Sequence, residues 1–126
     1  MAQGFGKDIQ VRSDRVSQLK RKIRNMYNSD DIMLSIMEVF TESELIPEVG
    51  NYYTFVYMAK TPKIIYDQYP LIAVTSIERW GFRGFNYHWN KFRNYTWREV
   101  IGKMHVIRAN EIEYLRILPY AKFIAK

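Results

Sequence analysis

The chain contains no cysteine, and only six glycines and four prolines among its 126 residues. The absence of cysteine excludes disulfides, thiolate catalysis and cysteine-based zinc sites, and it fits synthesis in a reducing compartment. No apolar run approaches the roughly 20 residues that a membrane-spanning helix needs. The first eight residues also lack the apolar stretch of a signal peptide. We therefore expect the protein to be soluble when it is made.

Groups suited to catalysis are also scarce. The only histidines, His88 and His105, lie in aromatic or apolar stretches, without an Asp or Glu at metal-ligand spacing. Such histidines more often pack in a sheet wall than act as bases. Asp67 precedes a proline-containing stretch, where Asp commonly caps a turn. No phosphate-binding loop, dinucleotide fingerprint or nucleophile elbow is present. We predict no enzymatic activity, no metal and no cofactor.

The net charge of +6 is divided unevenly along the chain. Residues 1–28 carry seven Lys or Arg and two Asp, whereas residues 29–50 carry six acids and no base. Residues 51–126 carry twelve bases and five acids. Such segments can pair head to tail with neighbouring copies or other subunits, and the basic surface can also hold nucleic acid. A solvated surface without a charged partner is the alternative.

Hydrophobic periodicity predicts two helices in the first half of the chain. Val16, Leu19 and Ile23 recur at spacings of three and four after a Ser-Asp helix start, which predicts an amphipathic helix over 14–27. A second Ser-Asp-Asp start predicts a helix over 30–40, with acids where the helix dipole favours them. A buried strand is the alternative for such a short apolar run. The apolar residues of this segment cover more than one face, so one side is available to another subunit. Residues 1–12 are expected to form an extended arm.

Alternation at period two then predicts short strands. Tyr53, Phe55 and Tyr57 alternate with smaller or more polar residues, and β-branched residues fill the later strand over 71–77. An acidic loop is expected before these strands, from 41 to 50. The predicted strands cover 53–58, 64–66, 71–77 and 85–89, with a glycine-flanked connection at 80–84 and a closing strand at 104–107. Short aromatic strands at close spacing indicate a small barrel.

Short helices are predicted after the strands. Thr96 and Glu99 have the spacing of a capping box, and Gly102 would stop the helix that follows. Asn110 is expected to cap a last helix over 111–118. The predicted fold class is α+β, with a small antiparallel β-barrel preceded by two N-terminal helices and followed by short C-terminal helices. Residues 1–50 would form an arm and helices and residues 51–126 the barrel with its helical additions, in one compact unit.

Aromatic and basic residues interleave over residues 79–98. Aromatic rings can stack on bases while Arg and Lys hold phosphates, and Trp and Arg are equally typical of protein interfaces. Alternate rings of the stretch are expected in the core. For the exposed remainder we expect a protein interface, with nucleic acid as the alternative. The predicted interface residues are Lys20, Arg21, Arg24, Arg79, Trp80, Arg83, Lys91, Arg93 and Arg98.

Four segments between residues 52 and 89 form a pattern of motifs. They are Tyr53-Thr54-Phe55-Val56-Tyr57, Lys60-Thr61-Pro62, Tyr66-Asp67-Gln68-Tyr69-Pro70-Leu71-Ile72 and Gly81-Phe82-Arg83-Gly84-Phe85-Asn86-Tyr87-His88. In these segments the chain resembles small virion proteins of contractile-tailed bacteriophages. The resemblance implies an SH3-like barrel with helical additions, and a place in the tail baseplate or at packaged DNA ends.

Together these features predict a non-enzymatic structural subunit of a bacteriophage particle. It would be made in the host cytoplasm, reside in the virion tail or baseplate, and dock other virion proteins in several copies of a symmetric assembly. Neither a membrane nor a small-molecule substrate is expected. The alternative is a DNA-end or duplex-binding virion protein, which predicts steep salt dependence. An enzyme such as a nuclease or peptidoglycan hydrolase needs a carboxylate or histidine cluster that the spacing does not supply.

Overall fold

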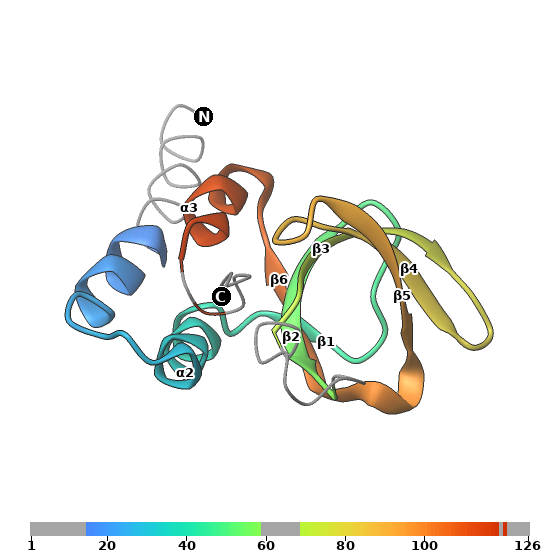
Figure 1. Ribbon diagram of the computed structural model, residues 1–126, viewed down its shortest axis with the longest axis horizontal. Coiled ribbons are helices and arrows are strands. Elements are labelled where there is room, and N and C mark those ends of the chain that lie inside the picture. Colours follow the sequence, from blue (N-terminus) through green and yellow to red (C-terminus); the bar gives the residue numbers. More distant parts are fainter. Residues whose placement is uncertain (1–14, 59–68, 119, 121–126) are drawn as a thin grey trace, which may run out of the picture.

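The computed structural model describes residues 15–58, 69–118 and 120. Six strands form one antiparallel sheet in the order β1-β6-β2-β3-β4-β5, and helices pack beside one half of it (Figure 1). The predicted α+β class is therefore confirmed. Within the described residues, no helix is long and apolar enough to cross a membrane.

The strands are β1 (Ser43–Glu44), β2 (Tyr52–Tyr57), β3 (Leu71–Ile77), β4 (Gly81–Asn86), β5 (Lys91–Thr96) and β6 (Val100–Ile107). The helical elements are a segment at 15–22, α2 (Ser29–Val39), the 3₁₀ turns η2 (Trp97–Glu99) and η3 (Ala109–Glu111), and α3 (Ile112–Arg116). The helix predicted over 30–40 and the strand predicted over 71–77 are confirmed. Asn28, rather than Ser29, caps α2, because its side chain accepts hydrogen bonds from the Asp30 and Asp31 amides.

The inner face of the curved sheet encloses its own core. Alternation along β2 directs Tyr53, Phe55 and Tyr57 to this face. The rings pack edge to face, with the centroids of Tyr57 and Tyr95 5.0 Å apart. The buried residues of this cluster are Tyr53, Phe55, Tyr57, Ile72, Val74, Phe82, Tyr95, Met104 and Val106. We call it the inner core.

The outer face is covered by helices only over part of its width. Leu71 and Ile107 of the sheet pack against the helical segment 15–22, α2 and α3. Figure 1 shows these helices gathered on one side of β2 and β6. The buried residues of this second cluster, the outer core, are Leu19, Ile23, Ile32, Met33, Ile36, Phe40, Leu71, Ile107, Ile112, Leu115, Leu118 and Tyr120. The two cores therefore lie on opposite faces of one sheet.

The expected barrel closure is not confirmed, because β1 and β5 are the two edges of the sheet. Strand β1 pairs with β6 through two residues. A strand as short as β1 cannot complete a closed ladder. The closing strand predicted over 104–107 is instead the end of β6, which lies inside the sheet between β1 and β2.

The predicted strand over 85–89 and the glycine-flanked connection before it are wrong. The strand β4 begins at Gly81, and residues 87–90, including His88, form a turn. The glycines belong to the strand because a neighbouring backbone comes close. A Cβ at Gly81 would lie 1.9 Å from the Tyr95 carbonyl oxygen, and one at Gly84 would lie 2.8 Å from that of Ala73. The sequence pattern does not distinguish a glycine that lets two strands approach closely from a glycine that forms a turn.

Three predicted helix boundaries are also wrong. The first helix ends at residue 22 rather than 27, and Tyr27 is 87 % exposed. Thr96 and Glu99 enclose only one 3₁₀ turn, because β6 starts at Val100 and pairs with β2. The last helix, α3, ends at Arg116 and is preceded by η3 rather than capped by Asn110. The arm 1–12, the strand 64–66, the turn at Asp67, Pro119 and the segment 121–126 lie outside the described residues.

The side chain of Asn86 fixes the turn between β4 and β5. Its Oδ1 accepts hydrogen bonds from the His88 and Trp89 amides at 2.8 and 3.0 Å. Its Nδ2 donates to the Tyr95 hydroxyl at 2.9 Å. Asn86 is buried, so every one of these bonds replaces a bond to water.

Replacing Asn86 by Ala should therefore lower the free energy of unfolding by about 2 kcal/mol, since two partly buried amides lose their acceptor and the Tyr95 hydroxyl loses a buried donor. Urea unfolding followed by circular dichroism measures the change. Asn94→Ala is the matched control, because Asn94 is exposed on the same hairpin and accepts one bond at 3.3 Å from Arg83. Equal losses for the two variants would contradict this role of Asn86.

Candidate interaction site

The hairpin of β4 and β5 carries six of the nine interface residues predicted from sequence, or lies beside them. Arg83 and Phe85 of β4 stand opposite Asn94 and Phe92 of β5 in the ladder. These four residues share the outer face, since Phe82 and Tyr95 of the same strands point into the inner core. The described helices lie on the other side of β2 and β6, and Phe92 is 50 % exposed (Figure 1). The structure thus leaves a mixed aromatic and polar sheet face open.

An aromatic strip connects the covered and uncovered parts of the outer face. Tyr52 lies 6.5 Å from Tyr87 between ring centroids, Tyr87 lies 5.2 Å from Phe85, and Phe85 lies 5.3 Å from Phe92. Tyr52 and Tyr87 pack against the outer core, whereas Phe92 at the other end faces solvent. The strip is therefore anchored at one end and available for contact at the other.

Cations of the hairpin lie over the exposed ring of Phe92 and the half-buried ring of Trp89. The Arg83 guanidinium is 5.1 Å from the centroid of Phe92. The Lys91 ammonium and the Arg93 guanidinium lie 5.7 and 4.8 Å from the centroid of Trp89. Each such contact is worth about 0.5–1 kcal/mol at an exposed site. They hold the cations in place, so less side-chain entropy is lost when a partner binds. Alternation along β5 places Lys91 and Arg93 on the face opposite Phe92. We call Arg83, Phe85, Trp89, Lys91, Phe92 and Arg93, which lie on both faces of this hairpin, the hairpin surface.

The charge of the hairpin is not balanced within the described part of the chain. Residues 79–98 contain five Lys or Arg and no Asp or Glu. Arg79, Arg83, Lys91 and Arg98 form no ion pair with any described residue. Trp80, in the turn between β3 and β4, is 46 % exposed beside Arg79. An anionic partner that meets these four cations would therefore gain attraction without first breaking an ion pair within the described part of the chain.

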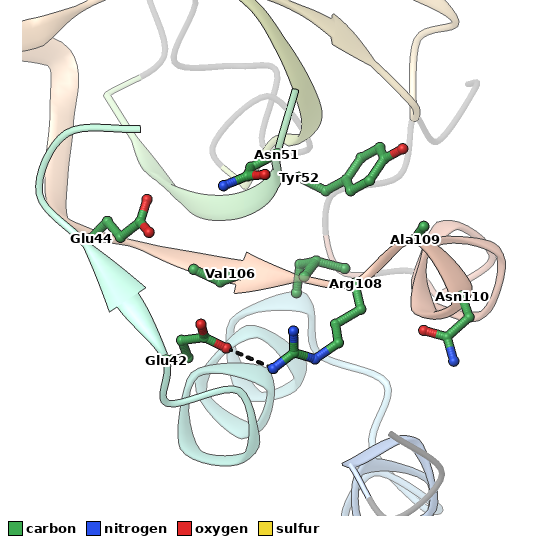
Figure 2. A pocket seen from close by; sticks show the side chains of 9 residues that line it. Glu42, Glu44, Asn51, Tyr52, Val106, Arg108, Ala109 and Asn110 are labelled. Atoms are coloured by element: carbon green, nitrogen blue, oxygen red, sulfur yellow. Dashed lines mark hydrogen bonds and ion pairs between the residues drawn. The ribbon is translucent and has the colours of Figure 1, made fainter. Parts of the chain in front are cut away.

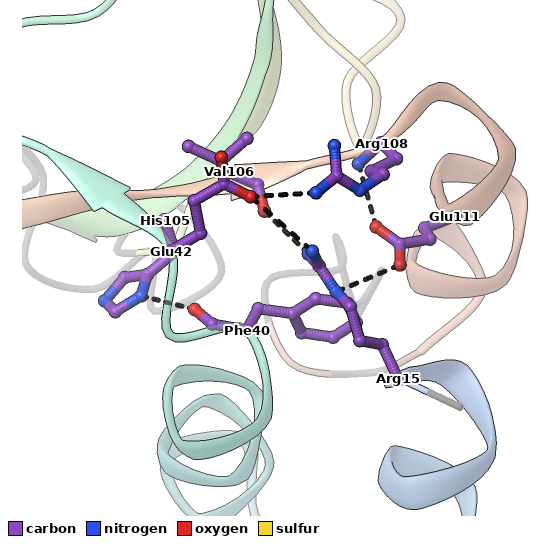
Figure 3. A network of polar contacts seen from close by, with 7 residues as sticks. All are labelled: Arg15, Phe40, Glu42, His105, Val106, Arg108 and Glu111. Carbon is purple, nitrogen blue, oxygen red and sulfur yellow. Dashed lines mark hydrogen bonds and ion pairs between the residues drawn. The ribbon is translucent and has the colours of Figure 1, made fainter. Parts of the chain in front are cut away.

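Basic side chains near the N-terminal helical segment differ from those of the hairpin, because some of them form internal ion pairs (Figure 3). Arg15 forms ion pairs with Glu111 at 3.1 Å and Glu42 at 3.7 Å, and donates to the Val106 carbonyl at 2.8 Å. Its guanidinium also lies 4.4 Å from the Phe40 ring centroid. Burial lowers the pKa of the Arg15 guanidinium below its usual value, and Glu111 offsets part of that effect. This network, which sequence reasoning missed, fastens the helical segment 15–22 to β6 and η3.

The remaining predicted interface residues, Lys20, Arg21 and Arg24, are exposed on the helical side. The Lys20 ammonium lies 5.2 Å from the ring of Tyr114 in α3. Lys22, which lies between Arg21 and Arg24 in the sequence, forms an ion pair with Glu38 of α2 at 3.0 Å. Within the described parts of the chain, no contact joins Lys20, Arg21 or Arg24 to the hairpin surface. The nine predicted residues therefore form two groups on two different layers.

An open hollow of about 450 Å³ lies between β1, β6 and η3 (Figure 2). Glu42 and Arg108 at its wall are already paired with each other at 3.1 Å. Its lining is Glu42, Glu44, Asn51, Tyr52, Val106, Ile107, Arg108, Ala109 and Asn110. Glu42 and Arg108 belong to the network of Figure 3, whereas Glu44 accepts a hydrogen bond from the Tyr53 hydroxyl.

The titratable residues weighed from sequence are dispersed. His105 lies in β6, with its Nδ1 2.8 Å from the Phe40 carbonyl, and the ring of His88 lies 5.2 Å from that of Tyr120. Asp30 accepts a hydrogen bond from the Tyr69 hydroxyl, and burial raises the pKa of Tyr69. In residues 15–58, 69–118 and 120, no three His, Asp or Glu side chains lie close enough together to hold a metal ion.

No protein-family model, curated protein or solved structure matches this chain.

Replacing Arg15 by Ala should lower the free energy of unfolding by about 3 kcal/mol, because the fully buried Glu111 loses an ion-pair partner. Chemical denaturation provides the measurement. Lys22→Ala, which breaks an exposed pair, should change stability by less than about 1 kcal/mol.

The double variant R15A/E111Q separates charge burial from lost packing. A neutral amide in place of the Glu111 carboxylate no longer needs a buried cation, so this variant should be more stable than R15A alone. If R15A/E111Q is as unstable as R15A, the loss comes from packing and the ion-pair account is wrong.

Proposed function

We propose that this protein is a non-enzymatic binding subunit of a bacteriophage particle, placed in the tail or baseplate, and that it docks neighbouring virion proteins through the hairpin surface. The observation that carries the proposal is a set of hairpin cations without carboxylate partners in the described chain, held against the aromatic rings of Phe92 and Trp89. Aromatic and Arg side chains in such an arrangement are the usual anchors of protein interfaces.

The placement in a phage particle rests on the resemblance of residues 52–89 to small virion proteins. In this proposal the curved sheet is a variant of the SH3-like barrel, with β1 and β5 as its unjoined edges. The helical layer on the outer face corresponds to the helical additions that the resemblance implies. Several copies in a symmetric assembly would then each present one hairpin surface to a neighbour.

The ring geometry supports a protein partner over nucleic acid. Stacking a base needs a free, flat aromatic face. One face of Phe92 is occupied by Arg83, and Trp89 is contacted by Lys91 and Arg93. Phe85 meets Phe92 edge to face, with 77° between the ring planes, so the pair presents no continuous stacking platform. Acidic and apolar groups of a protein fit such a surface better.

Binding to DNA ends or duplex DNA remains the second candidate. Its support is the run of residues 79–98 with five bases and no acid, which suits a phosphate backbone. The two candidates differ in their salt dependence, since counterion release makes phosphate binding fall steeply with salt.

Fluorescence anisotropy with short duplex DNA, open-ended or closed by hairpins, separates these candidates. For a protein-docking surface we expect DNA binding that disappears by about 0.15 M salt and shows no preference for open ends. R83E/K91E should remove the low-salt binding, whereas R21E/R24E, with the same charge change on the helical side, should weaken it less. Sub-micromolar binding at physiological salt with a preference for open ends would instead establish the DNA-end function.

The place in the particle has its own test. Quantitative mass spectrometry of gradient-purified particles of the source phage should detect this chain at a fixed ratio to the tail proteins. Particles stripped of DNA and heads should retain it if it belongs to the tail or baseplate. Recovery only with the DNA-filled heads would favour the DNA-end candidate, and absence from all particles would overturn the virion role.

A further inference from the structure

The loop between β1 and β2 exposes apolar side chains beside carboxylates. Leu45 and Ile46 are 71 % and 66 % exposed, and Val49 is exposed as well. Glu44 precedes them and Glu48 lies among them. The loop thus combines aliphatic side chains with negative charge, whereas the hairpin surface combines aromatic side chains with positive charge.

The carboxylates of this loop lack a base in the described part of the chain. Glu44 accepts a hydrogen bond from the Tyr53 hydroxyl, and Glu48 from the Asn51 side chain at 3.4 Å. Neither forms an ion pair with a described Lys or Arg, unlike Glu42 and Glu38 nearby. The network of Figure 3 therefore neutralises one part of the acidic segment and leaves the loop negative.

An apolar hollow adjoins the exposed side chains of the loop. It has a volume of about 400 Å³ and is lined by Leu45, Ile46, Trp97, Val100, Gly102 and Met104. The lining residues carry no charged side chain. We call this hollow the loop socket. An apolar hollow in a loop that also carries carboxylates suits an apolar side chain that is accompanied by cations.

We propose that the loop socket of one copy receives Phe92 of a second copy, with Glu44 and Glu48 meeting Arg83 and Lys91. This inference rests on the proposed docking function and names a second copy of the chain as a partner. The argument is complementarity of two kinds within one sequence. Phe92 is a half-exposed ring with Arg83 over it and Lys91 beside it in the chain, and neither cation pairs with a described carboxylate. The socket is an apolar hollow in a loop whose Glu44 and Glu48 pair with no described base.

The proposed contact joins two different surfaces of the chain. Repeated from copy to copy, such a contact closes into a ring or continues as a filament, and it can also occur twice in a two-fold dimer. Each copy buries exposed apolar side chains that a solitary monomer would leave in water. Charge pairing fixes which surface meets which, because hairpin against hairpin and loop against loop are repulsive.

Sedimentation velocity of the full chain over a range of concentrations, up to about 0.5 mM at low salt, measures the association. The wild type should form species heavier than one chain, and added salt should weaken them. F92A should raise the dissociation constant about tenfold or more, as expected for a central aromatic anchor. R21E/R24E serves as the control and should associate like the wild type.

Charge reversal on each surface tests the pairing itself. R83E/K91E makes the hairpin negative and E48K/V49K makes the loop positive without changing the lining of the socket, so either variant alone should be monomeric. Mixing the two should restore association, because each negative surface again meets a positive one. The chain that carries all four substitutions should associate by itself. The substituted residues are exposed, and thermal unfolding of each variant checks that the fold is kept.

A wild type that stays monomeric over the whole range would overturn the inference, and so would a mixture that fails to associate. Neither result touches the virion role, which depends on the presence of the chain in purified particles. Conversely, association without any place in a particle would keep the loop–hairpin contact and remove the proposed function.

Discussion

The strand β2 is buried on both faces, and the rest of the molecule is arranged around that constraint. Its odd-numbered residues, from Tyr53 to Tyr57, fill the inner core, while Thr54 points the other way. The Thr54 hydroxyl donates to the Pro70 carbonyl at 2.8 Å and lies 3.3 Å from the Tyr120 hydroxyl, so its polar group is satisfied where water is excluded. A helical layer must therefore cover β2, and it ends before β4 and β5, which leaves their outer face open.

The elements that sequence predicted well are those whose pattern arises within a few neighbouring residues. The helix over 30–40 has its capping and acidic first turn in adjacent residues, and the strand over 71–77 is a continuous β-branched run. The start of β4 could not be found that way. Gly81 and Gly84 serve a close approach to Tyr95 and Ala73, which are distant in sequence, so they resembled turn residues.

The candidate site was predicted in composition but not in arrangement. The aromatic and basic pattern of residues 79–98 marked the segment that carries the hairpin, although strand β5 was not predicted, and the division of charge marked the acidic segment. Sequence reasoning did not find which charges cancel internally. That Arg15 meets Glu111, and that Glu42 meets both Arg15 and Arg108, depends on contacts between residues up to 96 positions apart, which only the fold brings together.

The separation of the two cores has a consequence for how this protein can change. Phe92, Arg83 and Lys91 belong to neither core, so their replacement leaves both sets of buried contacts intact. Surface positions of this kind accept most substitutions with little effect on folding. Recognition can therefore diverge between related chains while the scaffold persists, and partner choice becomes a property that evolves independently of stability.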